Sequence, residues 1–343
     1  MQTPAKKSRQ DIRYSLIEIM TGSDLSRRRL AMMQASSPKS GPVVWLTACG
    51  HGDEVGGVVV IQEVFRMIRK YPLLQGRVNA FPLMNPLGLD LITRNITMSG
   101  EDLNRAFPGN RNGSLAQRIA FKIFNRITKS PPALVVDLHN DWRGSIPYTV
   151  LDPDPGPPNE EAYAKAREFA KMAGFALIRE TEGAGEEKLS RRTLSGSLLH
   201  HGIPAITLEL GEAFVVNERN IGYGVRSLWT ILSSLGMVGP IGEPFRYPLP
   251  EEAMDRELRY SQEPLSTTSG IIRFLSKAGD LVKPGQAVAR IYNAFGRNLE
   301  TIAARERALV LGHSDSSVAF PGVPVMAFGV FPEDPPPVTN QPS

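Results

Sequence analysis

Two hydrophobic periodicities alternate along the first two thirds of the chain. Short apolar runs rich in β-branched residues predict buried strands, and longer stretches with apolar residues at helical spacing predict helices. The strands are predicted at 43–48, 77–82, 133–138 and 205–210, and the helices at 58–68, 116–128, 159–173 and 224–235. This alternation is typical of a sheet with helices on its faces. We therefore expect an α/β fold with a mixed, mostly parallel sheet flanked by helices.

The C-terminal part follows a different pattern, in which short apolar stretches alternate with Pro-Gly turns. Residues 271–273 and 282–288 resemble residues 308–310 and 319–325, so this part contains an internal repeat. A repeated pattern of short strands predicts a small all-β barrel or sandwich, similar to the lipoyl or biotinyl carrier fold. The turn at 293–297 has no lysine for attachment of such a group, which favours a structural or site-shaping role.

The change in pattern divides the chain of 343 residues, which is longer than most single domains. Residues 1–246 are predicted to form the catalytic α/β domain, and residues 265–331 a smaller β-barrel-like domain that shapes access to its site. The segment between them, 247–264, is rich in proline and mixed charges and is predicted to be a linker. The Pro-rich tail, 332–343, is predicted to be disordered.

Composition and charge narrow the classes of function. Hydrophobic residues make up 41% and charged residues 22% of the chain, as in ordinary soluble globular proteins. The net charge is only +4 and no long basic block occurs, so we expect no nucleic-acid partner. Because no apolar run approaches the ~18–20 residues of a membrane helix, we expect no membrane partner. The single cysteine, Cys49, and an N-terminus without the apolar core of a signal peptide predict a cytoplasmic protein.

Candidate metal ligands follow two of the predicted strands. His51 and Glu54 lie in a Gly-rich turn after the strand 43–48, and His139 directly follows the strand 133–138. Open α/β sheets place their ligand sites at the carboxyl ends of strands. Two imidazoles and one carboxylate leave a tetrahedral zinc ion a fourth position for water, which is the arrangement of catalytic sites. The three side chains together therefore predict one catalytic zinc ion.

Each of these residues taken alone has a simpler interpretation. His51 and Glu54 could form a surface hydrogen bond, and His139 could be a buried histidine bonded to a backbone carbonyl. Asp137, two residues before His139, could orient an imidazole or hold a substrate group. The three ligands considered jointly favour the metal site, although such a group can also hold cobalt, manganese or iron.

A carboxylate inside an apolar strand is the candidate general base. Glu209 lies within the strand 205–210, where a charged group is costly to bury without a partner. Beside a zinc-activated water it could take the proton and later deliver it to the leaving amine. A buried salt bridge is the alternative interpretation, and Glu212 is the reserve candidate for the base.

A long polar segment supplies candidates for substrate binding. Arg94 could polarise a scissile carbonyl, and Arg105 with Asn104 could bind a substrate carboxylate, because guanidinium groups grip carboxylates bidentately. Asp102 belongs to the same predicted substrate-binding group. The alternative is that these are ordinary charged residues of a surface loop.

The order of these motifs closely resembles the succinylglutamate desuccinylase/aspartoacylase family, relatives of the zinc carboxypeptidases. The resemblance covers roughly residues 40–330 and is specific as an ordered set, although each fragment alone is not. The motifs are His51 to Glu54, Asn85 with Pro86, Arg94, Asp102 to Arg105, Asp137 to His139, and Leu208 to Gly211.

The resemblance implies a role for each matching residue. It implies His51, Glu54 and His139 as zinc ligands, Glu209 as the base, Arg94 as the carbonyl-polarising group, and Asn104 with Arg105 as the carboxylate clamp. It also implies a C-terminal β-domain that narrows access to the zinc and excludes long peptides. Two departures bear on specificity for aspartate or succinylglutamate: the interval from Arg94 to Asn104 is longer, and residues 195–204 contain no arginine.

The combined observations predict a zinc-dependent hydrolase that cleaves the amide bond of a small N-acyl amino acid or a related carboxylate-bearing acylated amine. The alternatives are a metallocarboxypeptidase acting on short peptides and a catalytically silent relative that binds a metabolite. The expected partner is a small N-acylated molecule, and the chain could form a homo-oligomer. Tyr223 and Tyr292 are candidates for an assisting tyrosine.

Overall fold

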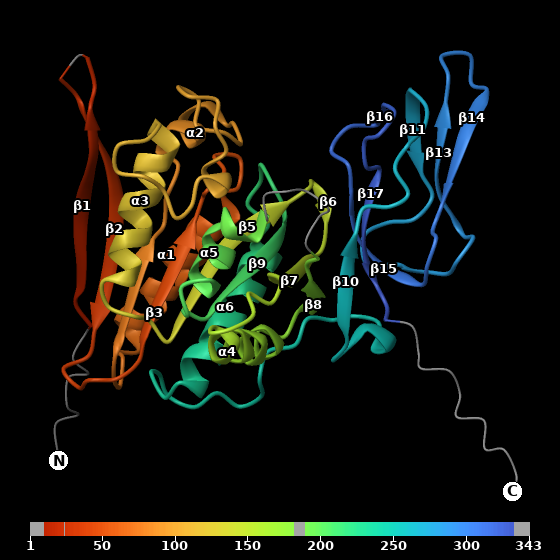
Figure 1. Ribbon diagram of the computed structural model, residues 1–343. Coiled ribbons are helices and arrows are strands. Elements are labelled where there is room, and N and C mark those ends of the chain that lie inside the picture. The colour runs from red at the N-terminus through yellow and green to blue at the C-terminus, as the bar shows by residue number, and fades with distance from the viewer. Residues whose placement is uncertain (1–9, 24, 182–188, 333–343) are drawn as a thin grey trace, which may run out of the picture.

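The computed structural model describes residues 10–23, 25–181 and 189–332, which form one large sheet with helices on both faces and a second, smaller sheet (Figure 1). The predicted disordered tail lies almost entirely outside the described residues. The helices are α1 (Gly56–Lys70), α2 (Pro86–Leu91), α3 (Leu115–Thr128), α4 (Glu160–Met172), α5 (Leu194–Leu199) and α6 (Glu218–Ser234), with short 3-10 helices η1 (Leu103–Arg105), η2 (Leu189–Arg191) and η3 (Glu251–Ala253).

The larger sheet has thirteen strands and is mixed. In spatial order its strands are β1 (Ile12–Thr21), β2 (Arg27–Ser36), β4 (Arg77–Phe81), β3 (Val43–Ala48), β5 (Leu134–Asp141), β9 (Ala205–Glu212), β7 (Pro147–Leu151), β8 (Ala176–Arg179), β10 (Glu257–Ser261), β17 (Met326–Val330), β15 (Ala308–His313) and β12 (Leu281–Val282), and β6 (Gly144–Ser145) pairs with β15. The central strands β4, β3, β5 and β9 are parallel to one another.

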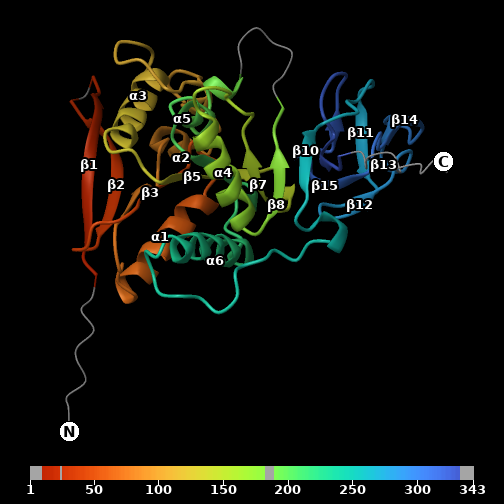
Figure 2. The ribbon, with the colours of Figure 1, turned by 60° about the horizontal axis from the view of Figure 1, so that its bottom comes forward.

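Strand β3 shows why the central strands are apolar along their whole length. Val44 and Leu46 point into the core that contains α1, α4 and α6, whereas Trp45 points to the opposite face and stacks on Phe81. That opposite face is covered by α3 and α5. Figure 2 shows α1 and α6 side by side on one face of the sheet and α3 on the other. A strand buried on both faces needs apolar residues at every position.

The structure confirms the expected mixed sheet with flanking helices and differs mainly at element boundaries. Helix α6 begins at Glu218 rather than at 224, because the side chain of Asn217 accepts hydrogen bonds from the backbone amides of Arg219 and Asn220 and caps the helix. The antiparallel hairpin of β1 and β2, and the strands β7 and β8, were not predicted.

The two copies of the C-terminal repeat exchange strands between sheets. The smaller, antiparallel sheet has the order β14 (Asn298–Ala303), β13 (Ala287–Tyr292), β11 (Gly270–Phe274) and β16 (Val318–Ala319). It therefore takes β16 from the second copy, while β12 from the first copy pairs with β15 in the larger sheet. The described strands form two sheets around a shared apolar core and do not close into a barrel.

The predicted linker contains a strand of the larger sheet. Within residues 247–264, β10 pairs in parallel with β8 and antiparallel with β17, so it joins the N-terminal and C-terminal parts of the sheet. Residues Glu257–Ser261 of the segment predicted to be a linker thus form a paired strand. The division into two domains stays a prediction. No helix of the described residues is long and apolar enough to cross a membrane.

Replacing two helical glycines by alanine tests how closely α1 packs against the sheet. A Cβ atom at Gly57 would lie 2.7 Å from the Cβ of Leu138 and 2.9 Å from that of Ala48, whereas one at Gly222 in α6 would meet no atom within 4 Å. Gly57→Ala should lower the free energy of unfolding by about 1–3 kcal/mol. Gly222→Ala should raise it by up to about 1 kcal/mol. Urea unfolding of both variants measures this, and equal effects would contradict the close packing of α1.

Candidate active site

Three neighbouring parallel strands bring the predicted site residues to one edge of the sheet. Strand β5 lies between β3 and β9, with Thr47 in register with Asp137 and His139 in register with Glu209. The His51 loop follows β3 at the same edge. Carboxyl ends of adjacent parallel strands meet at one side of a sheet, where ligands bind. Residues far apart in the sequence are therefore neighbours here.

The loop that carries His51 depends on two backbone features. Cys49 directly follows β3 and has a positive φ of 53°, which turns the chain away from the strand direction. A Cβ atom at Gly52 would lie 2.0 Å from the carbonyl carbon of Gly88, so only glycine fits there. Burial raises the pKa of the Cys49 thiol to about 12, so this thiol stays protonated and is a poor metal ligand.

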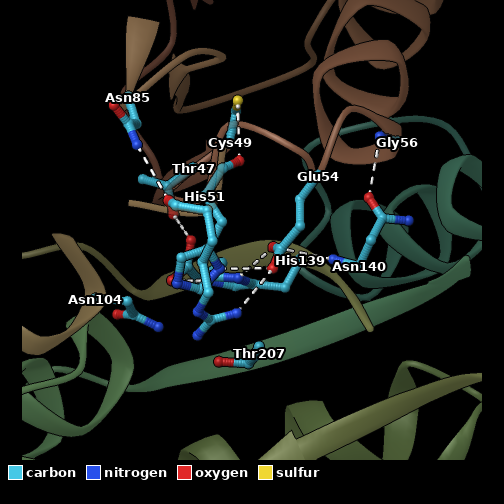
Figure 3. A network of polar contacts seen from close by, with 12 residues as sticks. Thr47, Cys49, His51, Glu54, Gly56, Asn85, Asn104, His139, Asn140 and Thr207 are labelled. Carbon is cyan, nitrogen blue, oxygen red and sulfur yellow. Dashed lines mark hydrogen bonds and ion pairs between the residues drawn. The ribbon is translucent and has the colours of Figure 1, made fainter. Parts of the chain in front are cut away.

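His51, Glu54 and His139 converge on one point (Figure 3). The Nδ1 atom of His51 lies 2.6 Å from one carboxylate oxygen of Glu54, and the Nδ1 atom of His139 lies 2.7 Å from the other. All three side chains are buried, and their ligand atoms lie within 4.8 Å of one another. Burial raises the pKa of Glu54, but the two adjacent imidazoles outweigh this and hold it below its ordinary value.

The opposite nitrogen of each imidazole faces a carboxylate. The Nε2 atom of His51 lies 3.0 Å from Asp102, and that of His139 lies 2.9 Å from Asp137. The hydroxyl of Thr47 donates a 2.6 Å hydrogen bond to Asp137 and holds it in place. A carboxylate at Nε2 favours the tautomer that leaves the Nδ1 lone pair free for a metal ion. With a cation bound, both Nδ1 atoms and the Glu54 oxygens could serve as its ligands, since the ligand atoms of the three side chains lie within 4.8 Å of one another.

Asn140 forms hydrogen bonds that connect Glu54 to the neighbouring helix and strand. Its backbone amide donates a 3.1 Å hydrogen bond to Glu54, and its side-chain oxygen accepts one from the amide of Gly56 at the start of α1. Its side-chain nitrogen donates to the carbonyl oxygens of Gly211 and Glu212 in β9. Figure 3 shows Asn140 between Glu54 and Gly56. These hydrogen bonds link strand β5, helix α1 and strand β9 next to His51, Glu54 and His139, which we call the candidate metal-binding group.

A cavity of about 380 Å³ opens onto these side chains. Glu209 lines it together with His51, Glu54 and His139. One carboxylate oxygen of Glu209 is buried and has no hydrogen-bond partner among the described residues. Burial raises the pKa of Glu209 well above its ordinary value, although His139 opposes this. A carboxylate with a raised pKa and one oxygen without a partner among the described residues is suited to accept a proton from a group in the cavity.

Arg94 and Asp102 lie beside the candidate metal-binding group. The guanidinium of Arg94 lies 3.1 Å from Asp102 and 3.6 Å from Glu54, and Arg94 lines the cavity. Asn85 donates a 3.3 Å hydrogen bond to the carbonyl of Arg94 and so positions this part of the loop. Both oxygens of Asp102 are engaged, since it contacts His51, Arg94 and the amide of Asn104. Asp102 therefore holds its neighbours rather than facing the cavity.

Asn104 and Arg105 line the cavity from the short helix η1. The side-chain oxygen of Asn104 accepts a 2.9 Å hydrogen bond from the amide of Leu194, and Figure 3 shows its nitrogen directed toward the centre of the site. Arg105 donates a 2.8 Å hydrogen bond to the carbonyl of Asn104. Glu212, the reserve candidate base, instead accepts hydrogen bonds from Asn217 and Asn220 and does not line this cavity.

The cavity also contains residues that sequence analysis missed. Tyr148 of β7 donates a 2.7 Å hydrogen bond to Asp141, and Tyr260 of β10 accepts a 2.8 Å hydrogen bond from Gln262; all four residues line the cavity. The suggested tyrosines do not, because Tyr223 packs against Phe245 and Tyr247 and Tyr292 lies in β13. Tyr260 carries no local signal, since it lies in the segment predicted to be a linker.

Comparison with known proteins identifies the family of this chain. The family described as "Succinylglutamate desuccinylase/Aspartoacylase catalytic domain" matches residues 40–235. The chain belongs to this family. Among its relatives, N-alpha-acetyl-L-2,4-diaminobutyric acid deacetylase of Halomonas elongata is 26% identical over 295 residues, which cover 82% of this chain and 80% of that protein.

Solved structures of this family share the fold along nearly the whole chain. A succinylglutamate desuccinylase from Silicibacter sp. TM1040 has a TM-score of 0.77 at 19% identity and covers 96% of this chain and 98% of that chain. The product-bound ectoine utilization protein EutE (DoeB) from Ruegeria pomeroyi has a TM-score of 0.76 at 19% identity, covering 96% and 97%. At these identities the likeness shows the fold.

The geometry of the three buried ligands predicts specific metal binding. After incubation with zinc and removal of free metal, the protein should retain about one ion per chain, because a site with two imidazoles and one carboxylate binds zinc tightly. His139→Ala should lose that ion. His201→Ala is the matched control, since His201 is exposed and bonds only the carbonyl of Ser197 among the described residues. Elemental analysis measures the metal, and equal retention by His139→Ala would contradict the site.

Proposed function

We propose that this protein is a zinc-dependent hydrolase that removes the acyl group from a small N-acyl amino acid. The observation that carries the proposal is that Glu209, with its unpartnered carboxylate oxygen, lines the same cavity as the group formed by His51, Glu54 and His139. The Halomonas elongata relative, named as a deacetylase of an N-acetyl amino acid, supports this reaction type.

In the proposed reaction each residue acts at a defined atom. Zinc, when held by His51, Glu54 and His139, supplies a Lewis acid that lowers the pKa of water and stabilises negative charge. Glu209 takes a proton from the attacking water and returns it to the nitrogen of the leaving amine. Arg94 lies on the cavity wall and donates to the carbonyl oxygen as negative charge develops on it.

Two further groups of residues support that chemistry without touching the reacting atoms. Asp102 and Asp137 hold the two imidazoles by their Nε2 atoms and so keep Nδ1 directed at the metal. In this proposal Asp102 is a positioning residue, which revises its predicted role in substrate binding. Asn104 and Arg105 remain the candidates for gripping a substrate carboxylate, since both line the cavity.

The size and walls of the cavity favour a small substrate over a peptide. Its volume of about 380 Å³ is at the low end for small-molecule sites. Tyr260 and Gln262 line it from β10 and the residue that follows, so the C-terminal part of the large sheet contributes one wall. A carboxypeptidase would need open space at this wall for the residues of the peptide that precede the scissile bond.

Replacement of the proposed base separates catalysis from metal binding. Glu209→Gln should keep the metal ion, yet lower kcat for hydrolysis of N-acetyl amino acids by about 10²–10⁴, because a general base contributes that much. Glu212→Gln is the matched control on the same strand, and it should keep most of the activity because Glu212 does not line the cavity. Steady-state kinetics of the zinc-loaded proteins measures both.

The same assay distinguishes the proposed reaction from its alternatives. The wild-type protein should hydrolyse N-acetyl, N-succinyl or N-formyl amino acids and leave unblocked dipeptides intact. Cleavage of dipeptides in preference to acyl amino acids would instead indicate a carboxypeptidase. Full activity of Glu209→Gln would contradict the assignment of the base, and a zinc-loaded protein inert toward all of these compounds would indicate a binding protein.

A further inference from the structure

The large sheet ends in two very different edge strands. Strand β12 lies at one end of the strand order and has only two residues. Strand β1 lies at the other end, has ten residues and pairs only with β2 among the described residues. Figures 1 and 2 show β1 as the outermost strand of the sheet. A very short edge strand offers little to a further strand, whereas a long one presents a row of unpaired backbone amides and carbonyls.

The sequence of β1 lacks the features that usually protect such an edge. Natural edge strands use lysine, proline or a bulge to prevent association with other strands. No lysine or proline occurs between Ile12 and Thr21, and the irregularity in register lies beyond Glu18. Arg13 is the one charged residue between Ile12 and Ile17. The regular stretch from Ile12 to Glu18 is therefore open to pairing with another strand.

Two exposed apolar side chains lie along this edge. Tyr14 and Leu16 are 62% and 60% exposed. They share the α1 face of the sheet with Ile12, which belongs to the core that contains α1, because side chains of a strand alternate between its faces. Arg69 of α1 donates a 2.8 Å hydrogen bond to the hydroxyl of Tyr14. This bond holds the ring in place, so little further ordering is needed when a partner packs against it.

Strand β1 is complementary to a second copy of itself. A two-fold axis normal to the sheet pairs identical edge strands in antiparallel direction, with one residue opposite its own copy. With Ser15 on the axis, Tyr14 faces Leu16 of the second copy on one face of the sheet. On the other face Arg13 faces Ile17 of the second copy. Each pair occurs twice, and apolar cross-strand pairs such as the first stabilise a sheet.

The charges of β1 favour the same arrangement. In the antiparallel pairing Ile12 faces Glu18 of the second copy, so Arg13 of one copy lies one position away from Glu18 of the other. Opposite charges therefore come together at both ends of the pairing, and no residue faces a like charge. A parallel pairing in register would instead place Arg13 beside Arg13. An extended segment of another protein could add to the same edge, but this symmetry of charge and apolar residues favours a second copy.

We propose that the protein forms a two-fold symmetric dimer through β1, in which the two large sheets join into one continuous sheet centred on Ser15. The β1 strands hydrogen-bond to each other through their backbones. Tyr14 and Leu16 of both copies form an apolar cluster across the axis. Strands β2 and β4 lie between β1 and β3, and the residues that line the active-site cavity come from other elements than β1 and β2. The dimer therefore leaves both cavities outside the contact.

Size-exclusion chromatography with light scattering measures the oligomeric state. The wild-type protein should have twice the mass of one chain at micromolar concentration. Leu16→Lys should raise the dissociation constant about 10- to 100-fold, because each copy loses an apolar side chain from the contact. Leu275→Lys is the matched control, since Leu275 is 51% exposed and follows β11 in the smaller sheet. A wild-type protein that is monomeric at every concentration, or equal effects of both variants, would overturn the proposal.

Disulfide cross-linking tests the register of the pairing. The native cysteine, Cys49, is buried, so mild oxidation of Ser15→Cys reports on the new thiol. Opposed residues of an antiparallel pair have Cβ atoms ~4.5–5.5 Å apart, and this variant should form a covalent dimer. Thr301→Cys, on the edge strand β14 of the smaller sheet, is the matched control and should stay monomeric.

The cross-linking result also decides the case in which Leu16→Lys fails to fold in a thermal melt. A covalent dimer of Ser15→Cys alone would then support the proposal. No covalent dimer of Ser15→Cys, or equal cross-linking of Thr301→Cys, would refute it. Neither measurement depends on zinc or on hydrolysis, so the dimer and the proposed function can fail separately.

Discussion

The placement of one buried carboxylate between two imidazoles is the constraint on which the rest of the site depends. The two carboxylate oxygens of Glu54 lie 2.6 Å and 2.7 Å from the Nδ1 atoms of His51 and His139, and all three side chains are buried. Burying these groups together is costly unless their charges and lone pairs are satisfied. A cation bound by all three side chains would compensate the carboxylate charge and the nitrogen lone pairs. The glycine turn, Asn140 and the two outer carboxylates hold the group in this arrangement.

The large sheet positions the other cavity residues around this group. Strands β3, β5 and β9 are parallel neighbours. The loop that carries His51 and Glu54, together with His139 and Glu209, therefore lies at the carboxyl-terminal edge of these strands. The antiparallel strand β7 then extends the cavity toward Asp152, and β10 brings Tyr260 from the C-terminal part. Rigid strands suit such a site because they fix distances between groups that never touch.

The sequence predicts the parts of this structure whose signals are local. The apolar run 43–48 and the helical spacing of 58–68 predict β3 and α1, and the sequence also predicts the grouping of His51, Glu54 and His139 that the structure shows. The positions of Tyr260 and Asp152 on the cavity wall could not be predicted from local sequence patterns. Their place in the cavity depends on pairing between β8 and β10 and between β7 and β9, which is a long-range property of the sheet.

Anomalous diffraction at the zinc absorption edge, from crystals of the zinc-loaded protein, tests the central claim most directly. The account predicts a single strong peak on each chain within bonding distance of the Nδ1 atoms of His51 and His139 and of the Glu54 carboxylate, at about 2.0–2.2 Å. A peak bound through the Nε2 atoms, a peak elsewhere in the molecule, or no peak beside Glu54 would contradict it.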